Sequence, residues 1–243
     1  MSSSNRTPFG LAVLDYFNGD TSATLIVYDE LGQKHQQSVS LFFRDPTEFP
    51  PLENEALDLC RGRILDIGAG VGRHSLALQE RGFSVCAVEV VPQCVTIMKR
   101  RGIRDSHCSD VLAFQAEPFD TVLCLMNGVG MAGDLAGLQP FLSHLRSLAK
   151  TGGQLLIDST DIREIPELSA LVERKAETGQ YFGEQQVQIE YKNLKGEPIK
   201  ELFVESELLT ETASRSGWTC QIIRADKGGR YLAQLTAKEA SSL

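Results

Sequence analysis

Three glycines at alternating positions, preceded by an acid, are the residues of this chain best suited to holding a ligand. The run Ile64-Leu65-Asp66-Ile67-Gly68-Ala69-Gly70-Val71-Gly72 begins as a short apolar segment and ends in a turn. Glycine adopts backbone dihedrals that other residues avoid, and it lacks the Cβ that would keep a ligand away from the main chain. The pattern predicts a strand that turns sharply into a helix, with a bare backbone at the turn.

A second acid lies where the next strand is expected to end. The apolar run Val85-Cys86-Ala87-Val88 leads directly into Glu89. A carboxylate at this point accepts two hydrogen bonds from the vicinal hydroxyls of a ribose, a chemistry that nicotinamide-dinucleotide sites use. Strand, glycine turn, helix, strand and terminal acid together predict a nucleoside-binding half of an open α/β sheet.

The spacing of the glycines separates two classes of nucleoside ligand. A dinucleotide-binding turn reads G-x-G-x-x-G, which from Gly68 requires glycine at position 73, and that residue is Arg73. The stretch from Asp66 to Gly72 instead resembles motif I of the class I S-adenosylmethionine-dependent methyltransferases, (D/E)-x-G-x-G-x-G. Three alternatives stay open: an NAD-dependent oxidoreductase, a non-catalytic adenosylmethionine-binding protein, and a tight turn in a domain that binds neither ligand.

The resemblance implies a set of residues that contact S-adenosyl-L-methionine and its product, S-adenosyl-L-homocysteine. In that family the glycine backbone lies against the methionyl part and the ribose, and the acid after the second strand binds the ribose hydroxyls. An acid after the third strand contacts the adenine amino group, a role that matches Asp110; N-capping of the segment from Val111 is the alternative for this residue. The residues expected at the cofactor are Asp66, Gly68, Ala69, Gly70, Gly72, Glu89, Val90, Asp110, Val111, Met126, Asn127 and Gly128.

The rest of the chain supplies the elements that must position these residues. A nearly continuous apolar run from Phe119 to Met126 predicts a strand buried on both faces, which opens into Asn127-Gly128 at the sheet edge where ligands bind. Further elements are expected as a helix from Pro92 to Arg101, a strand at 106–108, a helix at 138–148, a Gly152-Gly153 turn, a strand at 154–158 and a helix at 208–216.

Two final strands, at 220–224 and 231–235, are joined by a glycine-containing turn and predict an antiparallel hairpin. We therefore expect a single α/β domain over residues 1–243. Its fold is a Rossmann-like, seven-stranded, mostly parallel sheet with a C-terminal antiparallel hairpin, helices on both faces and small β-hairpin lid insertions. Its expected parts are an N-terminal cap (1–58), a cofactor-binding core (59–158), a lid insertion (159–203), and a C-terminal helix and hairpin (204–243).

Both segments outside the shared core carry hairpin patterns. In the first, runs at 25–28 and 38–43 flank a turn at 29–32; in the second, residues 186–191 alternate polar and apolar before a run at 199–204. We expect the two segments to pack together as a lid over the acceptor substrate. Peripheral hairpins that serve stability or dimer contact are the alternative.

Methyl transfer from a sulfonium is an in-line displacement, so positioning and exclusion of water supply much of the acceleration. A general base helps only if the acceptor is protonated at neutral pH, and the sequence does not decide whether one is used. Candidates for a catalytic role are Tyr16, His74 and Asp158, and candidates for binding the acceptor are Phe43, Arg44 and Asp161. The alternatives are core packing for the aromatic rings, an exposed helix face for His74, a surface position for Arg44 and helix capping for the two aspartates.

Charge and missing motifs narrow the class of partner. The formal net charge of −8 on 243 residues argues against a nucleic-acid partner, whose binding depends on Lys and Arg neutralising phosphates. Nucleic-acid amine methyltransferases carry Asn/Asp-Pro-Pro-aromatic after the fourth strand, whereas Asn127 here is followed by Gly128. A small-molecule acceptor is therefore favoured, although the acceptor and the methylated atom stay undetermined.

The remaining composition adds few constraints. None of the six cysteines forms a C-x-x-C pair, and the four histidines show no metal-ligand spacing, so reduced cysteines and no bound metal are expected. No segment is long and apolar enough to span a bilayer, which leaves a cytoplasmic location and no membrane partner as the default expectation. A homodimer is left open.

Overall fold

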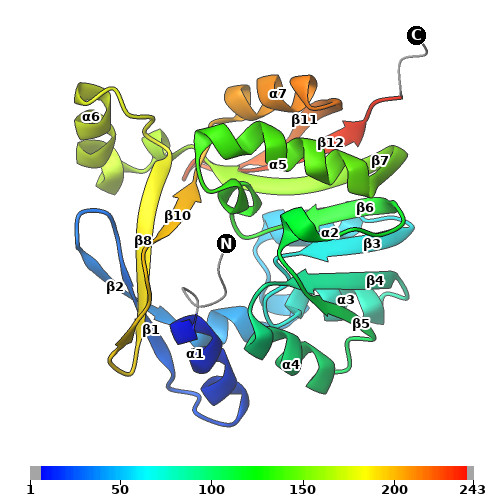
Figure 1. Cartoon of the computed structure of the whole chain (residues 1–243), viewed down its shortest axis with the longest axis horizontal. Coiled ribbons are helices and arrows are strands. Elements are labelled where there is room, and N and C mark those ends of the chain that lie inside the picture. Colours follow the sequence, from blue (N-terminus) through cyan, green and yellow to red (C-terminus); the bar gives the residue numbers. More distant parts are fainter. Residues whose placement is uncertain (1–6, 240–243) are drawn as a thin grey trace. The chain divides into compact units, whose positions relative to one another are not determined.

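The structure is a computed structural model that describes residues 7–239 (Figure 1). The chain forms two compact units. Unit 1 comprises the described residues up to Leu57 together with residues 65–114 and 186–199, and unit 2 comprises residues 58–64, 115–185 and those from 200 onward. Strand β3 (Arg63–Ile67) contributes residues to both units.

Seven strands are hydrogen-bonded in the order β11-β12-β7-β6-β3-β4-β5. The other six strands are β4 (Ser84–Glu89), β5 (Asp105–Cys108), β6 (Phe119–Cys124), β7 (Ala149–Thr160), β11 (Trp218–Ala225) and β12 (Arg230–Ala237). Pairs β4–β5 and β6–β7 are parallel, and β12 runs antiparallel to both β7 and β11. The predicted mostly parallel sheet with a C-terminal antiparallel hairpin is therefore confirmed.

Within unit 1, helices α3 (Arg73–Glu80) and α4 (Pro92–Arg100) follow β3 and β4 along the chain, as predicted. Helix α4 begins with Pro92 in its first turn, where a missing N–H has no cost, and carries Lys99 and Arg100 in its last turn. Its buried residues Val95 and Met98 belong to an apolar cluster. The other members are Ala69, which follows β3, Ala87 of β4, and Ile103, which follows α4.

The N-terminal segment differs from the prediction in two respects. Helix α1 (Thr7–Phe17) was not predicted. Strand β1 (Thr24–Tyr28) does pair with a second strand, but that strand is β2 (Lys34–Ser38) rather than residues 38–43. Residues 39–43 form the 3-10 helix η2 (Val39–Phe43), because the Ser38 hydroxyl caps the Ser40 N–H and the apolar side chains pack against α1 and its neighbours.

A second sheet has the strand order β10-β8-β1-β2, with β9 paired to β8 (Figure 1). Its later strands are β8 (Glu184–Tyr191), β9 (Leu194–Lys195) and β10 (Ile199–Leu202). Strands β1 and β8 are antiparallel, with Val27 opposite Ile189, and the Tyr28 hydroxyl donates to Glu190 at 2.7 Å. The two segments outside the core thus pack together, as expected, although their role as a lid stays a prediction.

Unit 2 contains helices α5 (Leu135–Leu148), α6 (Ser169–Glu177) and α7 (Ser206–Arg215). Helix α5 begins three residues earlier than predicted because Asp134 caps it by accepting from the Gly137 N–H. The expected Gly152-Gly153 turn is wrong: both glycines lie inside the long strand β7, beside a register shift against β6. Glycine here accommodates a bulge, as it often does within strands.

Between residues 7 and 239, no helix combines the length and apolar character needed to cross a membrane.

Candidate functional site

The turn between β3 and α3, residues 68–72, is called the glycine loop below. Gly68, Gly70 and Gly72 have φ values of 66°, 54° and 81°, the left-handed region that other residues avoid. The loop is closed by hydrogen bonds from the Gly68 N–H to the Val88 carbonyl at 2.9 Å and from the Gly72 N–H to the Ala69 carbonyl at 2.8 Å. The alternating spacing of the glycines therefore matches an alternation of left-handed residues.

Two of these glycines serve different purposes. A Cβ placed on Gly70 meets nothing within 4 Å, so the main chain there borders open space. A Cβ on Gly72 lies 2.1 Å from the Ile103 Cδ1 atom and 2.9 Å from the Met98 Cγ atom, so this position allows close packing inside the protein. Open space over Gly70 is what a ligand lying against the backbone requires, and the loop fits the cofactor in this respect.

Glu89 lies at the end of β4 and is 5% exposed. Its Oε2 atom accepts from the Gly70 N–H at 2.9 Å, and its Oε1 atom accepts from the Val90 and Val91 N–H groups at 2.8 and 2.9 Å. A carboxylate has about four acceptor positions, so these bonds hold the group rigidly and leave capacity for a hydroxyl donor. The second acid and the glycine loop thus belong to one hydrogen-bonded structure.

The first acid of the motif has a different environment. Asp66 is 2% exposed and accepts from the Ser75 hydroxyl of α3 at 2.6 Å. Burial raises the pKa of the Asp66 carboxyl above its ordinary value. This hydrogen bond joins β3 to α3, the two elements on either side of the glycine loop, so the side chain of Asp66 helps to fix the conformation of the loop.

The third acid acts as a cap. Asp110 precedes the 3-10 helix η4 (Val111–Ala113) and accepts from the Leu112 N–H at 2.9 Å. The N-cap alternative for this residue is therefore confirmed, and a contact with adenine stays a prediction because one group can do both.

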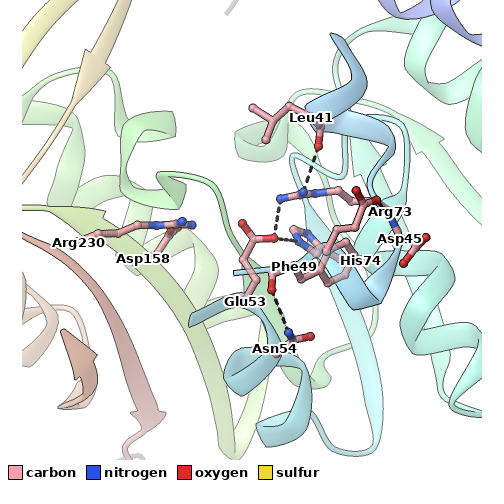
Figure 2. A network of polar contacts seen from close by, with 10 residues as sticks. Leu41, Asp45, Phe49, Glu53, Asn54, Arg73, His74, Asp158 and Arg230 are labelled. Carbon is pink, nitrogen blue, oxygen red and sulfur yellow. Dashed lines mark hydrogen bonds and ion pairs between the residues drawn. The ribbon is translucent and has the colours of Figure 1, made fainter. Parts of the chain in front are cut away.

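A buried polar network lies beside the start of α3 (Figure 2). Glu53, from α2 (Pro51–Leu59), is 2% exposed, and its Oε2 atom accepts from Arg73 at 2.6 Å and contacts the His74 Nε2 atom at 2.9 Å. Arg73 also donates to the Leu41 carbonyl at 3.1 Å and lies over the Phe49 ring. The expectation of an exposed His74 is wrong, because the imidazole is 5% exposed and bonded to a carboxylate.

Sequence reasoning missed Glu53. The only signal is an acid on the buried side of a helix, next to Leu52 and one turn before Ala56 and Leu57, which are all buried. A carboxylate at such a position requires a cationic or hydrogen-bonding partner. Those partners, Arg73 and His74, come from another helix, so their proximity is a tertiary property.

The N-terminal candidates form an aromatic stack. The rings of Tyr16 and Phe43 are stacked with centroids 4.6 Å apart, and Phe17 lies 6.3 Å from Phe43. Arg44 follows as the C-cap residue of η2. The packing alternative for Tyr16 and Phe43 is therefore supported by contacts, and their binding roles stay predictions.

The candidates in unit 2 surround the end of β6. Met126 and Asn127 have φ values of 67° and 60°, which is unusual for residues other than glycine. The Asn127 amide donates to Glu201 at 3.0 Å, and the Gly128 N–H donates to the Asp158 Oδ1 atom at 3.0 Å. Backbone strain of this kind clusters at functional sites, where the surrounding structure enforces it.

The two aspartates after β7 are already engaged. Asp158 is fully buried, and its Oδ2 atom accepts from Arg230 at 2.8 Å (Figure 2). Asp161 caps the 3-10 helix η6 (Ile162–Glu164) and pairs with Arg163 at 2.6 Å. The capping alternative is confirmed for Asp161, whereas Asp158 anchors the turn that follows β6.

One group in the described part of the chain combines metal-ligating atom types. Atoms of Cys86, Asp105 and His107 lie within 4.8 Å of one another, since Cys86 of β4 is opposite Asp105 of β5. His107 and Asp105 are exposed and pair with each other at 2.7 Å. The sequence did not indicate this cluster because its members come from two strands.

Comparison with known proteins identifies the class. A family model described as a methyltransferase domain matches residues 37–191. A SAM-dependent methyltransferase from Bacteroides fragilis, solved in complex with S-adenosyl-L-homocysteine, is 32% identical, and the match covers 97% of each chain with a TM-score of 0.85. This chain belongs to the SAM-dependent methyltransferases.

Two more distant matches are methyltransferases with different printed activities, one an O-methyltransferase and the other an N-methyltransferase. A ubiquinone biosynthesis O-methyltransferase from Xylella fastidiosa is 30% identical over 114 residues, which is 44% of this chain and 45% of that protein, so less than half of the relative's length is matched. A sugar N-methyltransferase from Streptoalloteichus shares the fold, with a TM-score of 0.58, 16% identity and coverage of 84% of this chain and 94% of that one.

Proposed function

We propose that this chain transfers a methyl group from S-adenosyl-L-methionine to a small-molecule acceptor. The observation that carries the proposal is the hydrogen bond from the Gly70 N–H to Glu89, which joins the open glycine loop to the carboxylate that we propose binds the ribose. Family membership and the net charge of −8 support it, as do the names of the two distant matches, a ubiquinone biosynthesis O-methyltransferase and a sugar N-methyltransferase.

The sulfonium of the methyl donor supplies an activated methyl group, so no metal or nucleophilic side chain is needed. The contribution of the protein is alignment. Gly70 leaves room for the donor along the main chain, and Glu89, held by three N–H groups, presents a fixed acceptor to the ribose hydroxyls. The methyl carbon bonds to the nucleophilic atom of the acceptor while its bond to sulfur breaks, and the electron pair of that bond stays on the sulfur.

No base is required for an acceptor that is already deprotonated. His74 is hydrogen-bonded to Glu53. Asp158 accepts hydrogen bonds from Arg230 and from the Gly128 N–H. We therefore propose structural roles for these two residues and assign no general base.

The test of the cofactor site is Glu89→Gln. The carboxamide keeps the shape of the side chain but replaces one acceptor oxygen with an NH₂ group, and in either orientation this donor faces a backbone N–H, which is also a donor. We expect S-adenosyl-L-homocysteine to bind more weakly. Its binding free energy, measured by calorimetry, should become less favourable by about 1–3 kcal/mol.

The matched control is Glu177→Gln, at the exposed C-terminal end of α6 in unit 2, for which affinity should not change. Titration of the wild-type protein with NAD tests the oxidoreductase alternative. Tight binding of NAD together with no binding of S-adenosyl-L-homocysteine contradicts the proposal. Transfer of a labelled methyl group in a metabolite extract then identifies the acceptor.

A further inference from the structure

The glycine loop is anchored through Val71. The Val71 side chain is 2% exposed and packs in a cluster with Ala12 and Val13 of α1, Leu25 of β1 and Val39 of η2. The loop therefore reaches into the apolar core of the N-terminal segment, although Val71 is 32 to 59 positions away from these residues along the chain.

A single arginine holds the main chain at the same position. Arg101, the C-cap residue of α4, donates from its Nη1 atom to the Val71 carbonyl at 2.8 Å. Burial lowers the pKa of this guanidinium below its ordinary value. The guanidinium lies over the Phe43 ring, with its carbon 5.5 Å from the ring centroid. Arginine suits this position because one group both donates a directed hydrogen bond and makes a cation–π contact with an aromatic ring.

The contacts continue into α1. Phe43 stacks on Tyr16 with centroids 4.6 Å apart and with an angle of 26° between the rings. A continuous path of contacts thus runs from the Val71 carbonyl through Arg101 and Phe43 to Tyr16. The C-terminal end of α4 and the residues after it also pack against the loop, because Met98 and Ile103 occupy the space next to Gly72.

We propose that Arg101 is a positioning residue for the cofactor loop, and that through Phe43 it couples cofactor binding to the ordering of α1 and η2. The inference rests on the proposed function, since it concerns the same loop. Coupling between two sites is reciprocal, so a cofactor that stabilises the loop must also stabilise α1.

The neighbouring Arg100 provides a matched control. It also lies at the end of α4, with its guanidinium 4.5 Å from the Phe17 centroid and a 3.1 Å bond to the Asn18 Oδ1 atom. A general effect of losing positive charge at this helix end appears in both variants. An effect on the loop appears only at Arg101.

The experiment compares Arg101→Met, Arg101→Lys and Arg100→Met in the full chain. Calorimetry gives the dissociation constant for S-adenosyl-L-homocysteine, and hydrogen exchange is followed over residues 7–17, 39–43 and 68–72 with and without that ligand. We expect about a tenfold weaker affinity for Arg101→Met, partial recovery for Arg101→Lys and less than a twofold change for Arg100→Met. Bound ligand should slow exchange in 7–17 for the wild-type protein and Arg100→Met, but not for Arg101→Met.

Equal affinities of Arg101→Met and Arg100→Met overturn the inference, as does ligand-induced protection of α1 that survives in Arg101→Met. If the wild-type protein binds no S-adenosyl-L-homocysteine, the proposed function fails, and the ligand-free exchange data decide the inference separately. Faster exchange in both 39–43 and 68–72 for Arg101→Met than for Arg100→Met then supports the contact path, and unchanged exchange refutes it.

Discussion

At the scale of single residues, the region around the glycine loop contains several buried ionisable groups. Glu53, Asp66 and Glu89 are 2%, 2% and 5% exposed. Burying a charge is costly unless hydrogen bonds or opposite charges compensate for it. Glu53 has Arg73 and His74, and Glu89 has three N–H groups, whereas Asp66 accepts from the neutral hydroxyl of Ser75.

The environment of Asp66 predicts a pH dependence of stability. Burial raises its pKa in the folded state above the unfolded value of 3.8. The stabilisation from this group is therefore complete below pH 3.8 and is lost as the pH rises through the folded-state pKa. Relative to Asp66→Asn, which does not titrate, the wild-type protein should lose up to about 1.4 kcal/mol of unfolding free energy per pH unit in that window.

Urea unfolding of both proteins at several pH values between about 4.5 and 7 measures this difference. Asn keeps an oxygen that accepts from Ser75, so the substitution retains the 2.6 Å contact. A difference in unfolding free energy that stays constant across the range would show that Asp66 does not hold its proton in the folded state.

At the scale of elements, the glycine loop is shaped by what lies on each side of it. Gly70 faces open space, and Gly72 faces Ile103 and Met98. The two positions have similar left-handed backbones, with φ of 54° and 81°. Alanine substitutions at them therefore share a backbone cost of about 1–2 kcal/mol and differ in everything else.

This difference predicts two distinct phenotypes. Gly70→Ala should lower the unfolding free energy by little more than the backbone cost, yet abolish measurable binding of S-adenosyl-L-homocysteine, because its methyl group enters the space proposed for the ligand. Gly72→Ala should destabilise the protein more, by about 3 kcal/mol or above, because its methyl group overlaps the core.

Thermal unfolding and calorimetry on the two variants separate stability from affinity. If Gly70→Ala binds the ligand as the wild-type protein does, the cofactor does not lie over this part of the loop.

At the scale of the whole molecule, the two compact units share three strands, β3, β8 and β10. Arg63 and Ile64 of β3 belong to unit 2, and Leu65 to Ile67 belong to unit 1. The single tryptophan, Trp218, is fully buried in unit 2 and donates to the Leu142 carbonyl at 3.0 Å, whereas the glycine loop belongs to unit 1. Tryptophan fluorescence therefore reports on the unit that does not contain the loop.

We expect the two units to unfold together, because separating them would disrupt the strands that they share. A ligand of the glycine loop at 100 times its dissociation constant stabilises the folded state by about 2.7 kcal/mol, which corresponds to a rise in Tm of roughly 5–10 °C. This rise should appear in the fluorescence of Trp218. A fluorescence transition that ignores the ligand, while circular dichroism shows a second, shifted transition, would mean that the units unfold independently.

Much of this protein follows from its sequence because the deciding interactions are local. The left-handed turns at Gly68, Gly70 and Gly72, the proline at the start of α4 and the C-terminal hairpin each depend on residues close together in the chain. Parallel strands in an open α/β sheet then place Glu89 near the glycine loop, so the family and the core fold could be predicted from the sequence.

The tertiary structure decided what depends on distant residues. The sequence of a charged or apolar residue does not show which residue it will contact. It was therefore not possible to predict that His74 is buried against Glu53 or that Arg101 donates to Val71. The same holds for residues 39–43, which form a 3-10 helix and not the predicted strand. In each case the free energy of packing and of pairing buried charges outweighs local preference, and that free energy exists only once the chain has folded.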